Sequence, residues 1–73
     1  MPRRLGLSPL QRDIMLLLEE AGAETVGTVI ATLKITDQDD FSAQINGLLT
    51  LGLVRREEAN LVLTERGKVA LRT

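Results

Sequence analysis

The hydrophobic pattern of this chain changes its period at Gly52, and this change limits the folds that the chain can adopt. Before the glycine, apolar residues recur at the spacing of one helical face: Phe41, Ile45, Leu48 and Leu49. After it, the segment LVRREEANLVLT fits two short strands, Leu53–Arg56 and Leu61–Leu63, joined by the polar residues EEAN. A glycine adopts the left-handed conformation that ends a helix sharply. The sequence therefore predicts a helix that runs directly into a β-hairpin.

A capping motif predicts the first helix of the chain. Ser8 is a preferred N-cap, Pro9 suits the first helical position, and Gln11 completes a capping box. An apolar stripe follows at helical spacing: Leu10, Ile14, Leu17, Leu18 and Ala21. Gly22 is the expected end of this helix.

Three more segments complete the predicted order of helix, helix, helix, hairpin, helix. Thr25 is a possible cap for a short second helix, although the residues AETV are also compatible with a short extended piece. Asp37 is a good cap for the third helix, and Thr64 caps a final short helix. Because no linker is long enough to separate domains, we expect one domain over residues 1–73.

The composition argues against several classes of site. The chain has no Cys and no His, so disulfides, thiolate chemistry and the common zinc ligand sets are absent. The carboxylate pairs Asp39/Asp40 and Glu57/Glu58 would need a pocket that shifts their pKa values before they could act in catalysis. We therefore expect no enzyme activity, no metal site and no cofactor. No apolar run approaches the roughly 20 residues that span a bilayer, and MPRRLGLSP lacks the apolar stretch of a secretory signal, so the expected location is cytoplasmic.

Three segments, together with the order of elements, resemble the winged helix–turn–helix domains of bacterial transcription regulators, such as those of the MarR type. The segments are LSPLQRDIMLLL, LLTLGLVRR and LVLTERGKVAL, and the resemblance covers about residues 8–71. It implies a mostly α fold with a small β-hairpin, built from three helices, a two-stranded wing and a short C-terminal helix. It also implies that the third helix is a recognition helix, which enters the major groove of DNA.

The resemblance also implies which residues contact double-stranded DNA. Base edges would be contacted from the outward side of the third helix, by Gln38, Asp39, Ser42, Ala43 and Asn46. Phosphates would be contacted by basic side chains of the N-terminus, the wing and the last helix: Arg3, Arg4, Arg55, Arg56, Arg66 and Lys68. Gly47 also falls on the outward side by helical spacing, where a small residue would permit close approach to DNA.

The charge of the third helix departs from that of a usual recognition helix. Asp39 and Asp40 would face a polyanion, and Glu57 and Glu58 make the tip of the hairpin acidic. Three explanations remain open. The aspartates stabilise the helix N-terminus by about 0.3–1 kcal/mol each, one of them accepts a hydrogen bond from cytosine N4, or the acidic face binds a basic protein. The sequence thus predicts a DNA-binding transcriptional regulator, with a winged-helix protein-interaction module as the alternative.

Met15 and Leu16 lie off the apolar stripe of the first helix, which leaves two explanations for them. They either pack against neighbouring elements of a very small domain or form a dimer surface. Because the chain has no extra helix for dimerisation, a homodimer would need Met15, Leu16 or the terminal segments. A lone module would bind DNA weakly, so we expect a homodimer or a larger complex.

Overall fold

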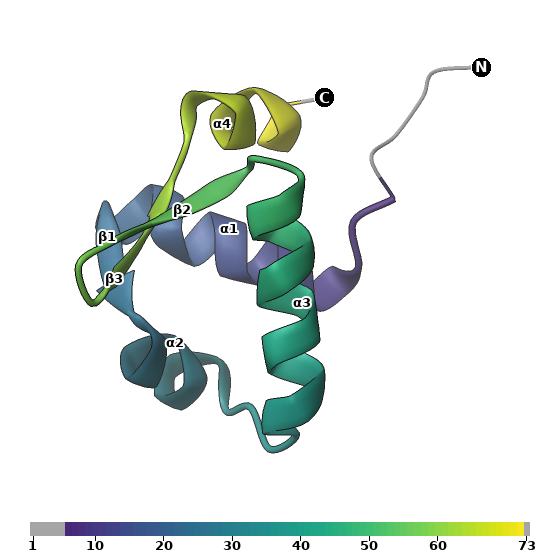
Figure 1. The fold of residues 1–73 in the computed structure, drawn as a ribbon, viewed down its shortest axis with the longest axis vertical. Helices are drawn as coiled ribbons and strands as arrows, with labels where there is room; N and C mark the ends of the chain where they lie inside the picture. The colour runs from purple at the N-terminus through teal and green to yellow at the C-terminus, as the bar shows by residue number, and fades with distance from the viewer. Residues whose placement is uncertain (1–5, 73) are drawn as a thin grey trace.

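The computed structural model describes residues 6–72, which form four helices and a three-stranded antiparallel sheet (Figure 1). The elements are α1 (Pro9–Ala21), β1 (Ala23–Thr25), α2 (Val26–Leu33), α3 (Gln38–Thr50), β2 (Val54–Glu57), β3 (Asn60–Leu63) and α4 (Glu65–Leu71). Strands β2 and β3 form the wing, and α2 and α3 form the helix–turn–helix. The predicted winged helix–turn–helix fold is confirmed.

Each helix begins at a side-chain cap. Ser8 and Gln11 form a complete capping box, in which Ser8 Oγ accepts from the Gln11 N–H at 3.1 Å and Gln11 Oε1 accepts from the Ser8 N–H at 3.0 Å. Single caps begin the other three helices: Thr25, Asp37 and Thr64. The four predicted caps are therefore confirmed.

The sheet contains one strand more than the predicted hairpin. Its order is β1-β3-β2, because residues 23–25 pair with β3 on the side opposite β2. The short extended piece expected in AETV thus forms at residues 23–25, and the helix expected after the Thr25 cap begins at Val26. The predicted first wing strand begins one residue later than expected, since Leu53 is part of the connection and its carbonyl accepts from the Thr64 N–H at 3.0 Å.

The core lies around α1, which contacts α2, α3, α4, β1 and β3. The buried apolar side chains come from all four helices, from β2 and β3, and from the connection before β2: Ile14, Met15, Leu18, Val29, Phe41, Ile45, Leu48, Leu53, Val54, Leu61, Leu63 and Ala70. Met15 has an exposed fraction of 0%, so the packing explanation holds for it and its proposed place in a dimer surface is wrong. Leu16, on the outer side of the same helix, is 44% exposed.

Two glycines allow the base of the wing to pack closely on the neighbouring helices. Gly52 has a φ of +74°, the left-handed conformation that was expected at the end of α3. Gly67 is buried in α4, where an added Cβ would collide with the carbonyl oxygen of Leu53 and would lie 2.6 Å from Leu63 Cδ1. The close approach of α4 to the base of the wing therefore requires a residue without a side chain at position 67.

Candidate nucleic-acid interface

Helix α3 runs along one edge of the molecule in Figure 1, with the wing and α2 to one side of it. Its inner side is buried through Phe41, Ile45 and Leu48. The five residues predicted to contact base edges are all exposed: Gln38, Asp39, Ser42, Ala43 and Asn46. Exposure is a requirement for contact with DNA, and the contact itself stays a prediction.

Gly47 does not lie on the outward side of α3, and this expectation is wrong. The residue is half-buried, and an ideal Cβ added to it would lie 2.9 Å from Nε2 of Gln11. The same nitrogen donates a hydrogen bond to the carbonyl oxygen of Gln44 at 3.2 Å. The reason is tertiary, since the N-terminal turn of α1 crosses this side of α3. Gly47 thus makes room for a neighbouring helix.

A chain of hydrogen bonds continues this contact along α3. Ser8 Oγ donates to Gln44 Oε1 at 2.9 Å, and Gln44 Nε2 donates to Asp40 Oδ1 at 3.3 Å. The Ser8 hydroxyl that caps α1 therefore also holds α3. The capping-box pattern predicted the cap, but nothing in it indicated this second role.

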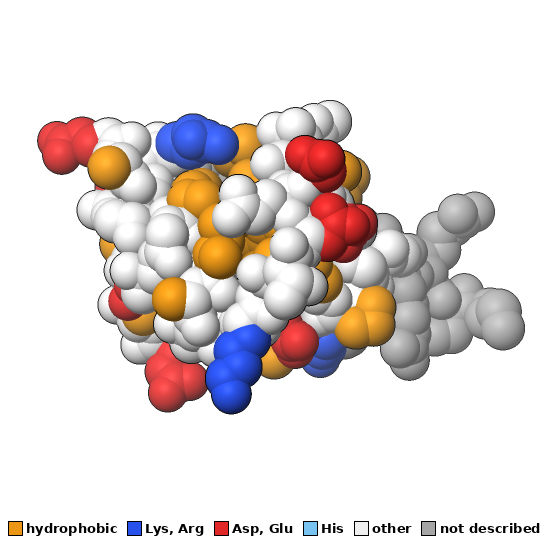
Figure 2. Space-filling view, turned by 90° about the horizontal axis from the view of Figure 1, so that it is seen from below, with side chains coloured by type: hydrophobic (Ala, Val, Ile, Leu, Met, Phe, Trp, Pro, Cys, Tyr) orange, Lys and Arg blue, Asp and Glu red, His pale blue; other side chains and the backbone are white. Residues whose placement is uncertain are grey.

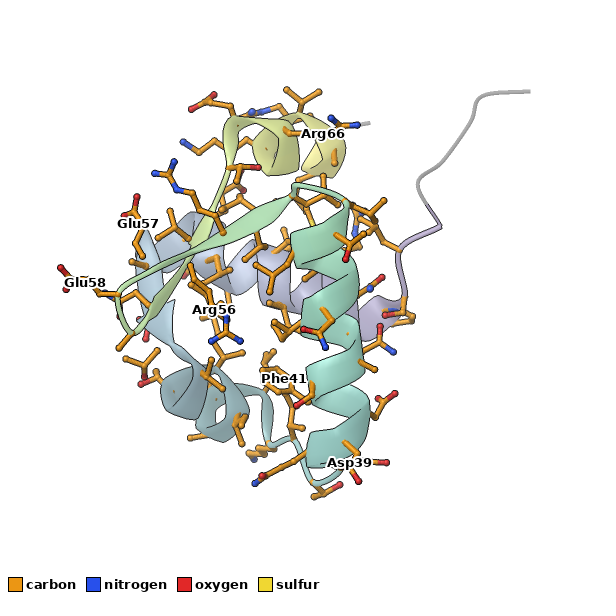
Figure 3. All side chains as sticks on the ribbon, in the orientation of Figure 1. Asp39, Phe41, Arg56, Glu57, Glu58 and Arg66 are labelled. Atoms are coloured by element: carbon orange, nitrogen blue, oxygen red, sulfur yellow. The ribbon has the colours of Figure 1, made fainter. Side chains whose placement is uncertain are left out.

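The three aspartates at the start of α3 have different surroundings. Asp37 caps the helix by accepting from the Asp40 N–H at 3.0 Å, and the Asp40 carboxylate accepts from Gln44. The Asp39 side chain makes neither a hydrogen bond nor an ion pair with any described residue. It lies at the foot of α3 and points away from the body of the molecule (Figure 3). Helix stabilisation thus accounts for the cap at Asp37 and applies equally to Asp39 and Asp40 in the first turn, and of the three carboxylates only that of Asp39 has no partner among the described residues.

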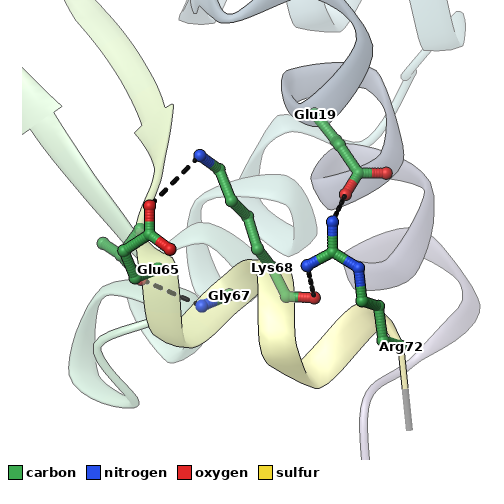
Figure 4. Close-up of polar contacts among 6 residues, drawn as sticks. Glu19, Glu65, Gly67, Lys68 and Arg72 are labelled. Carbon is green, nitrogen blue, oxygen red and sulfur yellow. Dashed lines mark hydrogen bonds and ion pairs between the residues drawn. The ribbon is translucent and has the colours of Figure 1, made fainter.

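The predicted phosphate-contacting residues also differ in their partners. Arg55 Nη2 lies 2.6 Å from Glu57 Oε2, and Lys68 Nζ lies 3.3 Å from Glu65 Oε1 (Figure 4 shows the latter pair). Within residues 6–72, neither Arg56 nor Arg66 has an ion-pair partner. Arg66 passes over the end of α3, where its Cδ lies 3.7 Å from an ideal Cβ at position 52. Arg3 and Arg4 lie outside the described residues.

The two adjacent arginines of β2 face opposite sides of the wing. Successive side chains of a strand alternate, so Arg55 and Glu57 share one side, and Arg56 lies on the other. Arg56 extends into the space between the wing and α3, towards Phe41 (Figure 3). There it lines a hollow of about 160 Å³, called the α3–β2 hollow below. The lining residues are Val26, Phe41, Ser42, Ile45, Asn46 and Arg56.

The α3–β2 hollow has an apolar floor and a polar rim. Phe41 and Ile45 are each 2% exposed, whereas Ser42, Asn46 and Arg56 are exposed. Seen from below, apolar side chains reach the surface in the middle of the molecule, and charged side chains surround them (Figure 2).

No group of His, Cys, Asp and Glu within the described range is arranged to hold a metal ion. None of the described helices is long and apolar enough to cross a membrane.

Comparisons with known proteins connect this fold with regulation of transcription. No family model matches the sequence, and no curated protein matches it either. Among solved structures, the chain is similar to a transcriptional repressor, CouR, bound to p-coumaroyl-CoA, with a TM-score of 0.81 and 28% sequence identity. The match covers 93% of this chain and 50% of that one, so the chain spans about half the length of the repressor.

Proposed function

We propose that this chain is a cytoplasmic winged-helix domain of the MarR type, which binds double-stranded DNA and regulates transcription without enzymatic activity. The observation that carries the proposal is the structural similarity to a transcriptional repressor over 93% of the chain. The three quoted segments around α1, the wing and α4 support the MarR-type assignment. The residues 1–73 would form a single domain.

In this proposal α3 enters the major groove with its N-terminal half. Gln38, Asp39 and Ala43 are exposed there and would approach base edges. A carboxylate accepts a hydrogen bond from cytosine N4, and a methyl group such as that of Ala43 contacts the 5-methyl group of thymine. Because Asp39 has no partner of its own among the described residues, its carboxylate is available for such a contact.

Phosphate contacts would come mainly from the cations that have no carboxylate partner. Of the predicted phosphate contacts within residues 6–72, Arg56 and Arg66 meet this condition. Arg55 and Lys68 each lie beside a glutamate, which offsets their charge. We therefore expect them to contribute less to binding than their neighbours. Arg3 and Arg4 remain proposed phosphate contacts of the N-terminal arm.

The ligand of the matched repressor does not enter this proposal. A site for a drug-sized ligand encloses roughly 300–1,000 Å³ and is mostly apolar. The α3–β2 hollow has a volume of about 160 Å³, and the larger hollow of about 500 Å³ at residues 36–39 is open to solvent and has no apolar residue in its lining. The chain also spans only half of that repressor's length. A homodimer, which would raise the affinity of so small a module for DNA, is part of the proposal, with Leu16 and the terminal segments as its candidate contacts.

The proposal is tested by titrating the protein into a labelled duplex of mixed sequence at several salt concentrations. Each neutralised phosphate contributes about −0.9 to the slope of log affinity against log salt. With Arg56 and Arg66 as the two predicted phosphate contacts that have no ion-pair partner within residues 6–72, we expect a slope of about −1.8 or steeper. The double variant Arg56→Gln/Arg66→Gln should make the slope shallower by about 1.8. Phosphate-driven affinity is highest at low salt, about 50 mM in such titrations. An absence of binding under these conditions would contradict the proposal. Capture of a basic protein instead would favour the interaction module.

A further inference from the structure

We propose that the α3–β2 hollow is a binding site for one phosphate of the DNA backbone, held jointly by Arg56, Ser42 and Asn46. The inference rests on the proposed DNA binding and makes it more specific. It transfers Ser42 and Asn46 from the base-contacting group, where helical spacing alone had put them, to the backbone-contacting group.

The rim of the hollow consists of hydrogen-bond donors from two elements. Arg56 contributes the planar guanidinium with its five N–H groups, Ser42 a hydroxyl, and Asn46 an amide NH₂. Ser42 and Asn46 are four residues apart in α3, so their side chains lie one turn apart on the same side of the helix. That side faces the wing, because both residues line the hollow together with Arg56. Three different donors therefore converge on one small space.

The charge of the hollow favours an anion. None of its six lining residues carries a carboxylate. Two acidic residues adjoin lining residues in sequence: Glu57 is paired with Arg55 on the opposite side of the strand at 2.6 Å, and the Asp40 carboxylate accepts from Gln44. Arg56 therefore presents an uncompensated positive charge to the hollow. Guanidinium groups bind phosphate oxygens in a bidentate manner. The remaining lone pairs of a phosphodiester can accept hydrogen bonds from neutral donors such as Ser42 and Asn46.

The apolar floor holds the guanidinium at the rim. The aliphatic part of an arginine side chain packs on apolar surface while its charged end stays in water. Phe41, Ile45 and Val26 offer such a surface beneath Arg56. A guanidinium held in this way loses less conformational freedom on binding than one on a free side chain.

The position of the hollow agrees with the path of a DNA strand. The walls of the major groove are the two sugar–phosphate backbones, so a helix inside the groove has a backbone on each side. The wing lies beside α3 and therefore beyond one of these walls. The backbone that separates α3 from the wing would pass over the hollow between them. A base edge, at the floor of the groove, would instead meet the outermost residues of α3.

The experiment compares Arg56→Gln with Arg55→Gln, its neighbour on the other side of the same strand. Both variants are titrated at several salt concentrations into a mixed-sequence duplex and into a duplex selected for binding from a random library. Arg56→Gln should make the salt slope shallower by about 0.9, the value for one phosphate, on both duplexes. Arg55→Gln should change the slope much less. Equal effects of the two variants would overturn the phosphate site.

Ser42→Ala and Asn46→Ala distinguish the backbone from the bases. As neutral donors to a phosphate, each should lower affinity by about 2- to 10-fold, equally on both duplexes and with the slope retained. If instead either variant weakens only the selected duplex and relaxes its preference at one base pair, that residue contacts a base and the inference is wrong, while DNA binding stands. If the unsubstituted protein binds neither duplex, the proposed function fails as well. Thermal unfolding of each variant checks that the fold is retained.

Discussion

Nε2 of Gln11 lies against Gly47, 2.9 Å from the point where any other residue would place its Cβ. This contact fixes the angle at which α3 crosses the start of α1, because Gln11 is also held by the capping box and donates to Gln44. Gly47 therefore has a packing role. Glycine inside a helix costs about 1 kcal/mol relative to alanine, and the Gln11 contact explains why this helix keeps it.

A double-mutant cycle tests this relationship. Gly47→Ala should change the free energy of unfolding by less than about 1 kcal/mol, because the gain in helix propensity is offset by displacement of the Gln11 side chain. In a Gln11→Ala background, where nothing opposes the new methyl group, the same substitution should stabilise by about 1 kcal/mol. Urea unfolding measures both. Neither substitution should alter DNA affinity, and a large loss for Gly47→Ala would return Gly47 to the DNA-facing surface.

Gly67→Ala should be among the most damaging single substitutions in the chain. The added methyl group would collide with the Leu53 carbonyl, which belongs to the backbone and cannot turn aside. We expect a loss of about 3 kcal/mol or more in the free energy of unfolding. The matched control is Gly27→Ala in α2, which meets nothing within 4 Å and should stabilise by up to about 1 kcal/mol. Similar unfolding midpoints for the two variants would contradict the close packing of α4 on the wing.

Asp39→Asn should affect DNA binding more than stability. Removal of its exposed charge from the helix N-terminus costs about 0.3–1 kcal/mol at most. Affinity for a mixed-sequence duplex should rise, because one carboxylate no longer repels the phosphates. On a selected duplex, the preference for cytosine at one position should be lost. Asp40→Asn serves as the control, since that carboxylate is engaged with Gln44. If Asp39→Asn raised affinity equally on every duplex, Asp39 would have no part in base recognition.

Glu58→Gly should stabilise the wing. Glu58 has a φ of +57°, a left-handed conformation that costs a residue with a side chain roughly 1–2 kcal/mol. Part of the gain is offset by the greater freedom of glycine in the unfolded chain, which leaves a net stabilisation of about 0.5–1 kcal/mol. Ala59→Gly, at the next position of the same turn, has no positive φ to relieve and should destabilise slightly. Thermal unfolding measures both variants. If the two melting temperatures shifted in the same direction, the strain at Glu58 would be disproved.

The same substitution bears on DNA binding, because it removes a negative charge from the tip of the wing. Glu58→Gly should therefore strengthen binding to duplex DNA at low salt, and the difference from the unsubstituted protein should shrink as salt is added. Ala59→Gly leaves the charge unchanged and should leave the affinity unchanged. An unaltered affinity for Glu58→Gly at low salt would mean that the wing tip stays away from the DNA.

The features that could be predicted without coordinates all depend on local interactions. The caps at Ser8, Thr25, Asp37 and Thr64 each join residues three apart, and the stripe through Phe41, Ile45 and Leu48 depends only on helical spacing. A short range in sequence makes such signals visible without coordinates, which is why the helices, the hairpin and the winged-helix fold could be predicted. The exposed strip of α3 followed from the same periodicity.

The surroundings of the other residues depend on how distant segments pack together. Gln11 reaches Gln44 across 33 positions, and Ser8 reaches it across 36, so no local pattern could show that Gly47 faces α1. The burial of Met15 likewise depends on how many elements surround α1. Arg55 and Arg56 point to opposite sides of the wing because side chains alternate along a strand. Their neighbours differ because α3 packs near only one of these sides, the side of Arg56. Contacts between distant segments are set by packing, and packing is a property of the whole fold.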